Sequence, residues 1–206
     1  MNEQTSNKMH NNTQQSAPQG RWKLFLVILI CALPLILSYV TYYVIKPTSR
    51  TNYGTLLDPR LYPIPRLNSV LQGGGPEELS EFKGKWVMLQ VSSSNCQAPC
   101  QNGLFAMRQL RLMQGKDMDR IERVLLITDN QPMETSLIRQ YDGVHILRAD
   151  SGPVNAWLPV EQGETVQDRL YLIDPLGNLM MRYNVDADPN KVKKDIIKLL
   201  KASSIG

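Results

Sequence analysis

The sequence predicts an α/β domain, a central mixed sheet with flanking helices, behind one N-terminal transmembrane helix. Three observations support this prediction. A stretch of 22 residues near the N-terminus carries no charge, short apolar runs alternate with helical patterns from residue 85 onward, and two late runs flank a four-residue turn. Strands that alternate with helices indicate a parallel sheet with right-handed crossovers, to which the last two strands add an antiparallel hairpin.

The uncharged stretch extends from Leu24 to Ile45 and would measure about 33 Å as a helix, close to the roughly 30 Å hydrocarbon core of a bilayer. Trp22 precedes the stretch and tyrosines lie near its other end, as interfacial aromatic residues do. A secretory signal peptide has a shorter apolar region, of roughly 7–15 residues, and a small-residue cleavage site. We therefore interpret residues 21–46 as an uncleaved anchor, with a cleaved signal sequence as the alternative.

Composition divides the rest of the chain. Residues 1–20 include eight Asn or Gln and no hydrophobic pattern, which predicts a disordered polar tail. Residues 47–66 contain four prolines, which predicts an extended, semi-stiff connector. Residues 67–206 are then expected to form one folded domain.

The charge distribution argues against nucleic-acid binding. The chain holds 23 Lys and Arg against 19 Asp and Glu, a net charge of +4, but residues 1–47 carry +3 of it and residues 48–206 carry +1. A nucleic-acid-binding domain needs a basic surface, and this domain has no global excess of positive charge. Three cysteines are too few for a disulfide scaffold, and two histidines exclude a His-rich metal site.

Hydrophobic periodicity predicts five strands and four helices in the domain. Short apolar runs rich in strand formers indicate the strands, and apolar residues spaced by three or four positions indicate the helices. The expected strands cover residues 85–92, 123–128, 144–147, 169–174 and 179–183. The expected helices cover residues 100–114, 132–141, 151–158 and 189–201. The tetrad Pro-Leu-Gly-Asn at 175–178 is turn-forming and predicts a hairpin between the last two strands.

The order of these elements is β-α-β-α-β-α-β-β-α, with two cysteines directly after the first strand. A βαβ half followed by a ββα half, with paired cysteines in this position, describes a thioredoxin-like fold. A flavodoxin-like sheet is the alternative. Doubly wound folds of that kind are mainly parallel, so the terminal hairpin argues against it.

Cys96 and Cys100 carry the clearest chemistry in the sequence. They lie where a predicted strand ends and a predicted helix begins, and a helix N-terminus stabilises a thiolate by its partial positive charge and its free N–H groups. At a spacing of four residues, the two sulfur atoms can approach each other across the first turn. Pro99 fits that turn, and Asn95 is the expected N-cap.

The chemistry of the pair leaves several interpretations open. Two close sulfurs support either a reversible disulfide or the binding of a soft ion such as Cu(I). An inert disulfide and two buried thiols are the simpler alternatives. A structural zinc site would need two further ligands, whereas the domain has no second cysteine pair and a single histidine, His145. Cys31 lies within the predicted span and is interpreted as a small apolar residue.

The cysteine pair also bears on location. Disulfides persist in oxidising compartments, so we expect a single-pass protein of a bacterial inner membrane with its domain in the periplasm. This orientation is inferred from the chemistry of the pair, because the positive charges on the two sides of the span are nearly balanced.

Three segments of the domain together resemble the Sco/SenC family. They read SSSNCQAPC at 92–100, ITDNQP at 127–132 and YLIDPLG at 171–177, and they follow a single N-terminal anchor. The resemblance covers roughly residues 67–203. It implies a thioredoxin-like protein that helps to assemble the copper centre of cytochrome c oxidase, with a respiratory oxidase subunit or another assembly factor as its partner.

The resemblance implies a function in thiol–disulfide exchange, in which Cys96 is the exposed nucleophile and Cys100 resolves the mixed disulfide. A thiol–disulfide oxidoreductase is thus one interpretation. A second is a Cu(I) metallochaperone that uses Cys96 and Cys100 as metal ligands. A third is a non-catalytic assembly or interaction module, in which the disulfide stiffens a loop.

The sequence departs from the family pattern at the expected copper site. The family has a proline after its second cysteine, where this chain has Gln101. Family members also place a copper-binding histidine shortly before the hairpin, where residues 163–170 contain none. His145 lies in another predicted strand. Met180 and Met181 are soft candidate ligands, but strand methionines are expected in the core. The sequence therefore predicts a divergent member that lacks the usual histidine ligand.

Overall fold

The computed structural model describes residues 19–45, 52–72 and 77–205. The chain divides into two compact units, Met1–Arg50 and Thr51–Gly206. The predicted tail 1–20 lies almost wholly outside the described residues, as does the beginning of the predicted connector, 47–51.

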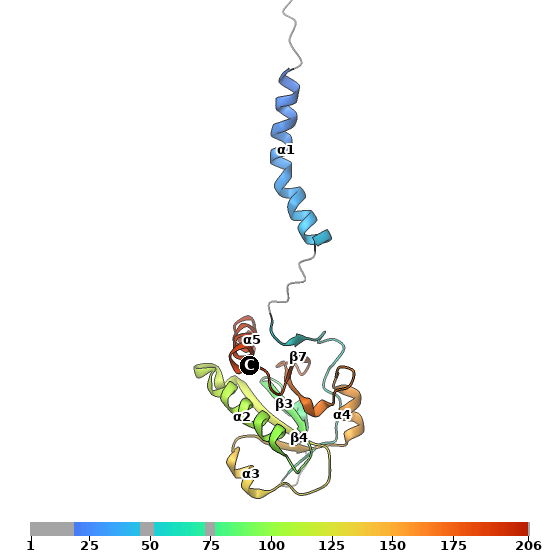
Figure 1. Ribbon diagram of the computed structural model, residues 1–206, viewed down its shortest axis with the longest axis vertical. Helices are drawn as coiled ribbons and strands as arrows, with labels where there is room; N and C mark the ends of the chain where they lie inside the picture. Colours follow the sequence, from blue (N-terminus) through green and yellow to red (C-terminus); the bar gives the residue numbers. More distant parts are fainter. Residues whose placement is uncertain (1–18, 46–51, 73–76, 206) are drawn as a thin grey trace, which may run out of the picture. The chain divides into compact units, whose positions relative to one another are not determined.

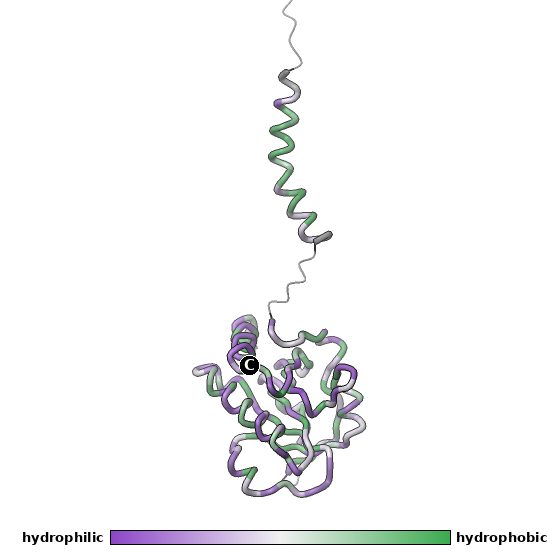
Figure 2. The backbone as a smooth tube through the Cα atoms, in the orientation of Figure 1, coloured by the Kyte–Doolittle hydropathy of each residue, from purple (hydrophilic) through white to green (hydrophobic). Residues whose placement is uncertain are grey.

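One long helix makes up the described part of the first unit. α1 (Gln19–Val40) continues into the short π-helix η1 (Thr41–Ile45) and is the long hydrophobic segment in Figure 2. The stretch Trp22–Tyr43 contains an 18-residue window with a mean hydropathy of 2.6 and is long and apolar enough to cross a membrane. Pro34 lies inside it, which a transmembrane helix tolerates. These features support the predicted membrane anchor.

The second unit is built on a mixed seven-stranded sheet with the order β1-β7-β6-β3-β4-β5-β2 (Figure 1). The central strands β3, β4 and β5 are parallel, β6 is antiparallel to β3, and β6 and β7 form the predicted hairpin. The strands are β1 (Thr55–Leu56), β2 (Val70–Leu71), β3 (Trp86–Ser92), β4 (Ile121–Ile127), β5 (His145–Arg148), β6 (Arg169–Ile173) and β7 (Leu179–Asn184). The predicted mixed sheet is confirmed.

Helices cover both faces of this sheet. The α-helices are α2 (Ala98–Leu112), α3 (Thr135–Gln140), α4 (Ser151–Trp157) and α5 (Pro189–Ala202), and the 3₁₀ turns are η2 (Leu79–Phe82), η3 (Gly115–Arg120) and η4 (Val166–Asp168). α3 begins three residues later than expected, because the extended backbone of Glu134 forms its N-cap. The order of β3 to β7 and α2 to α5 follows the prediction, whereas β1 and β2 were not predicted.

The sheet separates two hydrophobic clusters. In one, side chains of α2, α3 and α5 pack on the sheet, with Leu104, Leu137 and Ile196 among them. In the other, Val154 and Trp157 of α4 pack on the opposite face together with residues of η2. The alternation of side chains along each strand produces this division, since neighbouring residues point to opposite faces.

The segment that leads into the domain takes part in the sheet. Residues 52–66, which the sequence predicts as connector, contain β1, in which Thr55 pairs with Arg182 of β7. The buried carboxylate of Asp195 on α5 accepts hydrogen bonds from the backbone N–H groups of Tyr53 (2.7 Å) and Gly54 (2.9 Å). A buried carboxylate that accepts two backbone N–H groups holds this segment on α5.

Candidate functional site

The structure brings the two predicted cysteines together at the junction of β3 and α2. Cys96 and Cys100 form a disulfide, with their Cα atoms 5.1 Å apart. Both belong to the hydrophobic cluster beneath α2, and they are 0% and 6% exposed, respectively. The pair therefore lies at the expected place in the fold but is shielded from solvent while the disulfide is intact.

Two expectations about this loop were wrong. Cys96 is fully buried, whereas the resemblance implied an exposed nucleophile. The N-cap of α2 is Gln97, with an extended backbone, and not Asn95. Both differences follow from the backbone of Cys96, whose φ of +27° lies in the left-handed region that residues other than glycine rarely adopt. This turn directs Cys96 into the core and places the N-cap two residues after Asn95, so that α2 begins at Ala98, between the predicted cap and the predicted helix range of 100–114.

Hydrogen bonds fix the turn on both sides of Cys96. Its N–H donates to the carbonyl of Ser93 (3.1 Å), and its own carbonyl accepts from Nε2 of Gln101 (3.0 Å). The N–H of Ser94 donates to the carboxylate of Asp129, which follows β4 (3.0 Å). The strained residue is therefore held by three neighbouring contacts.

The carboxylate of Asp129 is stabilised in its charged form. Desolvation raises its pKa, but the hydrogen bonds from Ser94 and from the N–H of Gln131, together with the charge of Arg148, outweigh this and hold the pKa below its usual range. Arg148 Nη1 lies 3.8 Å from the carboxylate and donates to the carbonyl of Asp129. The loop after β4 thus presents a negative charge to the backbone of the cysteine loop.

Beneath the disulfide lies a buried amide. Gln90 on β3 donates from Nε2 to the carbonyl of Cys100 (3.3 Å), and its Oε1 is buried without a hydrogen-bond partner. Gly103 on α2 leaves room for this amide, because a Cβ at that position would overlap with it. The close approach of helix and strand at Gly103 places Cys100 directly over the sheet.

A polar cavity of about 270 Å³ adjoins Cys96 on the side of α3. It is lined by residues of the cysteine loop and of the segment around α3: Ser94, Asn95, Cys96, Gln101, Pro132, Glu134, Ser136, Leu137 and Gln140. Because Cys100 does not line it, this cavity approaches the disulfide from the Cys96 side.

No third metal ligand accompanies the cysteines within the described residues, where no group of three or more His, Cys, Asp and Glu side chains could hold a metal ion. His145 begins β5 and contacts the ring of Phe82 and the carboxylate of Glu122. In the register of the parallel strands it is level with Val124 of β4 and Leu89 of β3, three residues before the end of β3 that leads into the cysteine loop. Met181 is buried in the core, as expected for a strand methionine.

The segment in which the resemblance to Sco/SenC proteins implies a histidine forms a closed turn. In η4 the carboxylate of Asp168 accepts hydrogen bonds from the N–H (2.9 Å) and the hydroxyl (2.7 Å) of Thr165. These bonds, the hydroxyl first, hold the pKa of Asp168 below its usual range. Residues 163–170, which lack the histidine of the Sco/SenC pattern, thus contain a local hydrogen-bonded turn.

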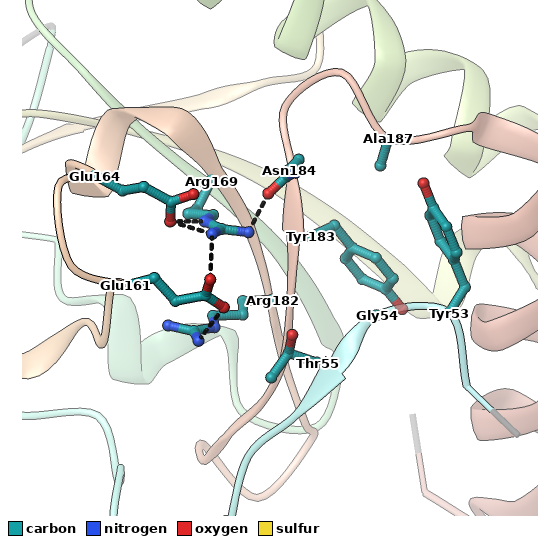
Figure 3. Close-up of a pocket in the computed structure, with 10 residues that line it drawn as sticks. All are labelled: Tyr53, Gly54, Thr55, Glu161, Glu164, Arg169, Arg182, Tyr183, Asn184 and Ala187. Carbon is teal, nitrogen blue, oxygen red and sulfur yellow. Dashed lines mark hydrogen bonds and ion pairs between the residues drawn. The ribbon is translucent and has the colours of Figure 1, made fainter. Parts of the chain in front are cut away.

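A second polar cluster, the arginine cluster, consists of Arg169, Arg182, Glu161 and Glu164 (Figure 3). The arginine side chains are 7% and 10% exposed, while Glu161 is 58% exposed. Arg169 donates to Glu164 from Nε (2.8 Å), and Arg182 donates to Glu161 from Nη2 (2.9 Å). Two buried positive charges are therefore neutralised by carboxylates from one loop.

The arginine cluster borders a cavity of about 300 Å³, whose far side is formed by Tyr53 and Tyr183 (Figure 3). Sequence reasoning missed these residues, because charged residues within a predicted strand are expected to face solvent. Two carboxylates shortly before a strand that begins with arginine were the available signal.

Solved structures of other proteins share the fold of this domain. No curated protein matches this sequence. The chain is similar to a SCO1/SenC family lipoprotein from Bacillus anthracis str. Ames, with a TM-score of 0.55 and 20% identity over 71% of this chain and 99% of that one.

Two further solved structures are similar to this chain. BsSco, a member of the Sco family of cytochrome c oxidase assembly proteins with an identified disulfide switch, gives a TM-score of 0.51 and 17% identity over 68% and 95% of the two chains. Copper-bound ScoI from Arabidopsis thaliana gives a TM-score of 0.51 and 13% identity over 68% and 98%. At these identities the similarity shows the fold, and the predicted resemblance to Sco/SenC proteins is confirmed at that level.

A family model described as "Transmembrane-like, thioredoxin-like, C-terminal domain" matches residues 86–203. The match begins at β3, includes both cysteines and ends with α5. Because it spans more than half of the sequence, the chain belongs to this transmembrane-like, thioredoxin-like family.

Proposed function

We propose that this protein assists cytochrome c oxidase assembly by thiol–disulfide exchange through Cys96 and Cys100. The observation that carries the proposal is the disulfide at the junction of β3 and α2, next to a polar cavity that reaches Cys96. A helix N-terminus stabilises the thiolate that forms when such a bond opens. This arrangement supports the interpretation of the protein as a thiol–disulfide oxidoreductase.

The exchange needs a dithiol on the partner, for which we propose an oxidase subunit or another assembly factor. A partner thiolate attacks Sγ of Cys96, the bond to Cys100 breaks, and Cys100 leaves as a thiolate that takes up a proton. The partner's second thiolate then attacks the sulfur of the partner's first cysteine in the mixed disulfide and releases Cys96. Two electrons and two protons pass from the partner to the cysteine pair, and the reverse sequence oxidises the partner.

The burial of Cys96 places a condition on this reaction. Disulfide exchange requires access of the attacking thiolate to one sulfur, and Cys96 is 0% exposed in the oxidised protein. The cavity beside α3 is lined in part by Cys96, so we propose that the segment around α3 moves away when a partner binds.

The relatives support the oxidase part of the proposal. BsSco is a cytochrome c oxidase assembly protein in which a disulfide switch was identified, and its fold is similar. We also propose that the protein lies in a bacterial inner membrane with its domain in the periplasm, since a disulfide persists in an oxidising compartment. The apolar helix α1 supports the anchor.

The test replaces both cysteines in the native bacterium. We expect the Cys96→Ser/Cys100→Ser double variant to lose most cytochrome c oxidase activity in isolated membranes, while Cys31→Ser, a cysteine substitution in α1, keeps it. Immunoblotting shows whether each variant accumulates equally. Normal oxidase activity in the double variant would contradict the proposed role. Protease added to spheroplasts should degrade the domain, and protection from it would contradict the periplasmic orientation.

The burial of the pair favours a second candidate, a non-catalytic interaction module. A disulfide with both cysteines in the hydrophobic core can serve to fix the loop between β3 and α2. Its reduction potential would lie below about −300 mV, as for structural disulfides. A potential in this range, together with normal oxidase assembly in the double variant, would favour this function over exchange.

Copper carriage by the reduced pair is the third candidate. Copper-bound ScoI has a similar fold, and thiolates select Cu(I). Within the described residues no third acidic, histidine or cysteine ligand joins the pair, so Cys96 and Cys100 would hold the ion alone. Anaerobic titration of the reduced protein with Cu(I) tests this function, and an affinity no higher than that of the double variant would exclude it.

A further inference from the structure

We infer that Gln101 is a positioning residue that stabilises the oxidised cysteine loop and thereby lowers the reduction potential of the Cys96–Cys100 pair. The inference rests on the proposed thiol–disulfide exchange and assigns a role to the residue directly after Cys100. Gln101 does not touch the sulfur atoms through any described bond, and it acts through the backbone of Cys96.

Gln101 ties three segments together. Its backbone N–H donates to the carbonyl of Gln97 in the first turn of α2 (3.0 Å), and its side-chain Nε2 donates to the carbonyl of Cys96 (3.0 Å). Its own carbonyl accepts a hydrogen bond from the hydroxyl of Tyr141, just after α3 (3.2 Å). One residue thus connects the cysteine loop with the segment that forms the opposite wall of the cavity.

The bond to Cys96 holds an unfavourable backbone conformation. A φ of +27° is strained for a residue with a Cβ, and such a conformation persists where its surroundings enforce it. The disulfide and the amide of Gln101 both act on this residue, one at the sulfur and the other at the carbonyl. When the disulfide opens, Cys96 is free to return to a negative φ, and its carbonyl turns away from Gln101.

The hydrogen bond therefore belongs to the oxidised form. An interaction made in the oxidised form and lost in the reduced form makes the disulfide harder to reduce. Removal of the Gln101 side chain shifts the equilibrium toward the dithiol, by about fivefold for one ordinary hydrogen bond. For a two-electron couple this corresponds to a reduction potential about 20 mV higher.

The experiment equilibrates the full-length chain, in detergent, with mixtures of dithiothreitol and its cyclic disulfide. In this reaction one dithiothreitol becomes the cyclic disulfide and Cys96–Cys100 becomes two thiols, so electrons and protons balance. The fraction reduced is counted by alkylation and mass spectrometry. Gln101→Ala is compared with Gln97→Ala, a matched control whose exposed side chain makes no capping hydrogen bond to α2.

We expect half of Gln101→Ala to be reduced at a ratio of dithiothreitol to cyclic dithiothreitol disulfide about fivefold lower than for the native chain. For Gln97→Ala this ratio should be unchanged. Gln101→Glu has almost the same shape but cannot donate a hydrogen bond when ionised, so it should shift the equilibrium in the same direction even if the alanine variant folds poorly. An unchanged equilibrium in either folded Gln101 variant, or an equal shift in Gln97→Ala, would overturn the inference.

This measurement is independent of oxidase assembly. Normal oxidase in the Cys96→Ser/Cys100→Ser strain would remove the proposed function and leave the shift caused by Gln101 intact. A disulfide that exchanges normally but is indifferent to Gln101 would leave the proposed function standing and remove the inference.

Discussion

The two faces of the central sheet bury two different kinds of cross-link, a disulfide on one face and ion pairs on the other. On the face under α2 and α5, Cys96 and Cys100 lie in the hydrophobic cluster as a covalent pair. Arg169 and Arg182 alternate along β6 and β7 with residues of that cluster, so they project from the opposite face and are held by ion pairs. Each group fixes a loop, one before α2 and the other before β6.

The difference lies in what can release each loop. Thiols open the disulfide and leave the ion pairs intact, whereas protonation or substitution of the glutamates weakens the ion pairs and leaves the disulfide intact. The ion pairs of the arginine cluster are thus independent of whether the cysteine pair is oxidised or reduced. Substitutions that remove either the ion pairs or the disulfide test this difference.

The largest effect is expected for the arginine cluster. Arg169→Met removes one charge of a buried network and leaves Glu164 without its main partner, which should lower the free energy of unfolding by about 3 kcal/mol. Urea denaturation of the full-length chain measures the loss. Arg139→Met, at an exposed position on α3, is the control. Similar losses for the two variants would show that the buried network does not support the fold.

The disulfide should contribute less, because it closes a loop with a sequence separation of four residues. The loop-entropy model gives about 2 kcal/mol for so short a loop. Melting temperatures with and without a phosphine reductant test this value, and the Cys96→Ser/Cys100→Ser variant should not respond to the reductant. A loss on reduction greater than that of Arg169→Met would reverse the comparison.

A smaller effect is expected where the segment before β1 closes the cavity of the arginine cluster. Asp195→Asn removes the charge that accepts the N–H groups of Tyr53 and Gly54 and should lower stability by about 1 kcal/mol. Amide hydrogen exchange should accelerate at these two residues and not at the disulfide loop. Asp186→Asn, an exposed position, serves as control. Unchanged exchange at Tyr53 would mean that other contacts hold the segment.

The smallest effect concerns acid. The hydroxyl and N–H of Thr165 hold the pKa of Asp168 below its usual range. A carboxyl whose folded-state pKa is depressed contributes stability above its unfolded pKa, and this contribution is lost as the pH falls through the folded value. Thr165→Val should therefore reduce the acid dependence of stability below about pH 4. Melting curves between pH 3 and 7 check this, with Gln167→Ala as control, and identical acid branches would contradict it.

Much of the fold could be predicted because its elements have clear local patterns. Apolar runs identified β3 to β7, and the cysteines after β3 identified the site. β1 and β2 have two residues each, too few for any periodicity, and β1 pairs with a strand more than 120 residues away. Their existence depends on tertiary contacts that a local pattern does not contain.

The details of the sites were less predictable for a different reason. A positive φ at Cys96 has no local signal, since the residue is not glycine, and it decided both the burial of Cys96 and the position of the N-cap. The burial of Arg169 depends on Glu161 and Glu164, which a loop brings to it. In both cases the outcome depends on a partner several residues away in the chain.

The short outer strands of the sheet have a consequence for encounters between two copies of the domain. β1 and β2 occupy the two edges of the sheet and together offer four residues of strand. Long, flat edges invite pairing with a second molecule, and very short ones discourage it. The short edges therefore discourage the domain from extending its sheet into a neighbouring molecule.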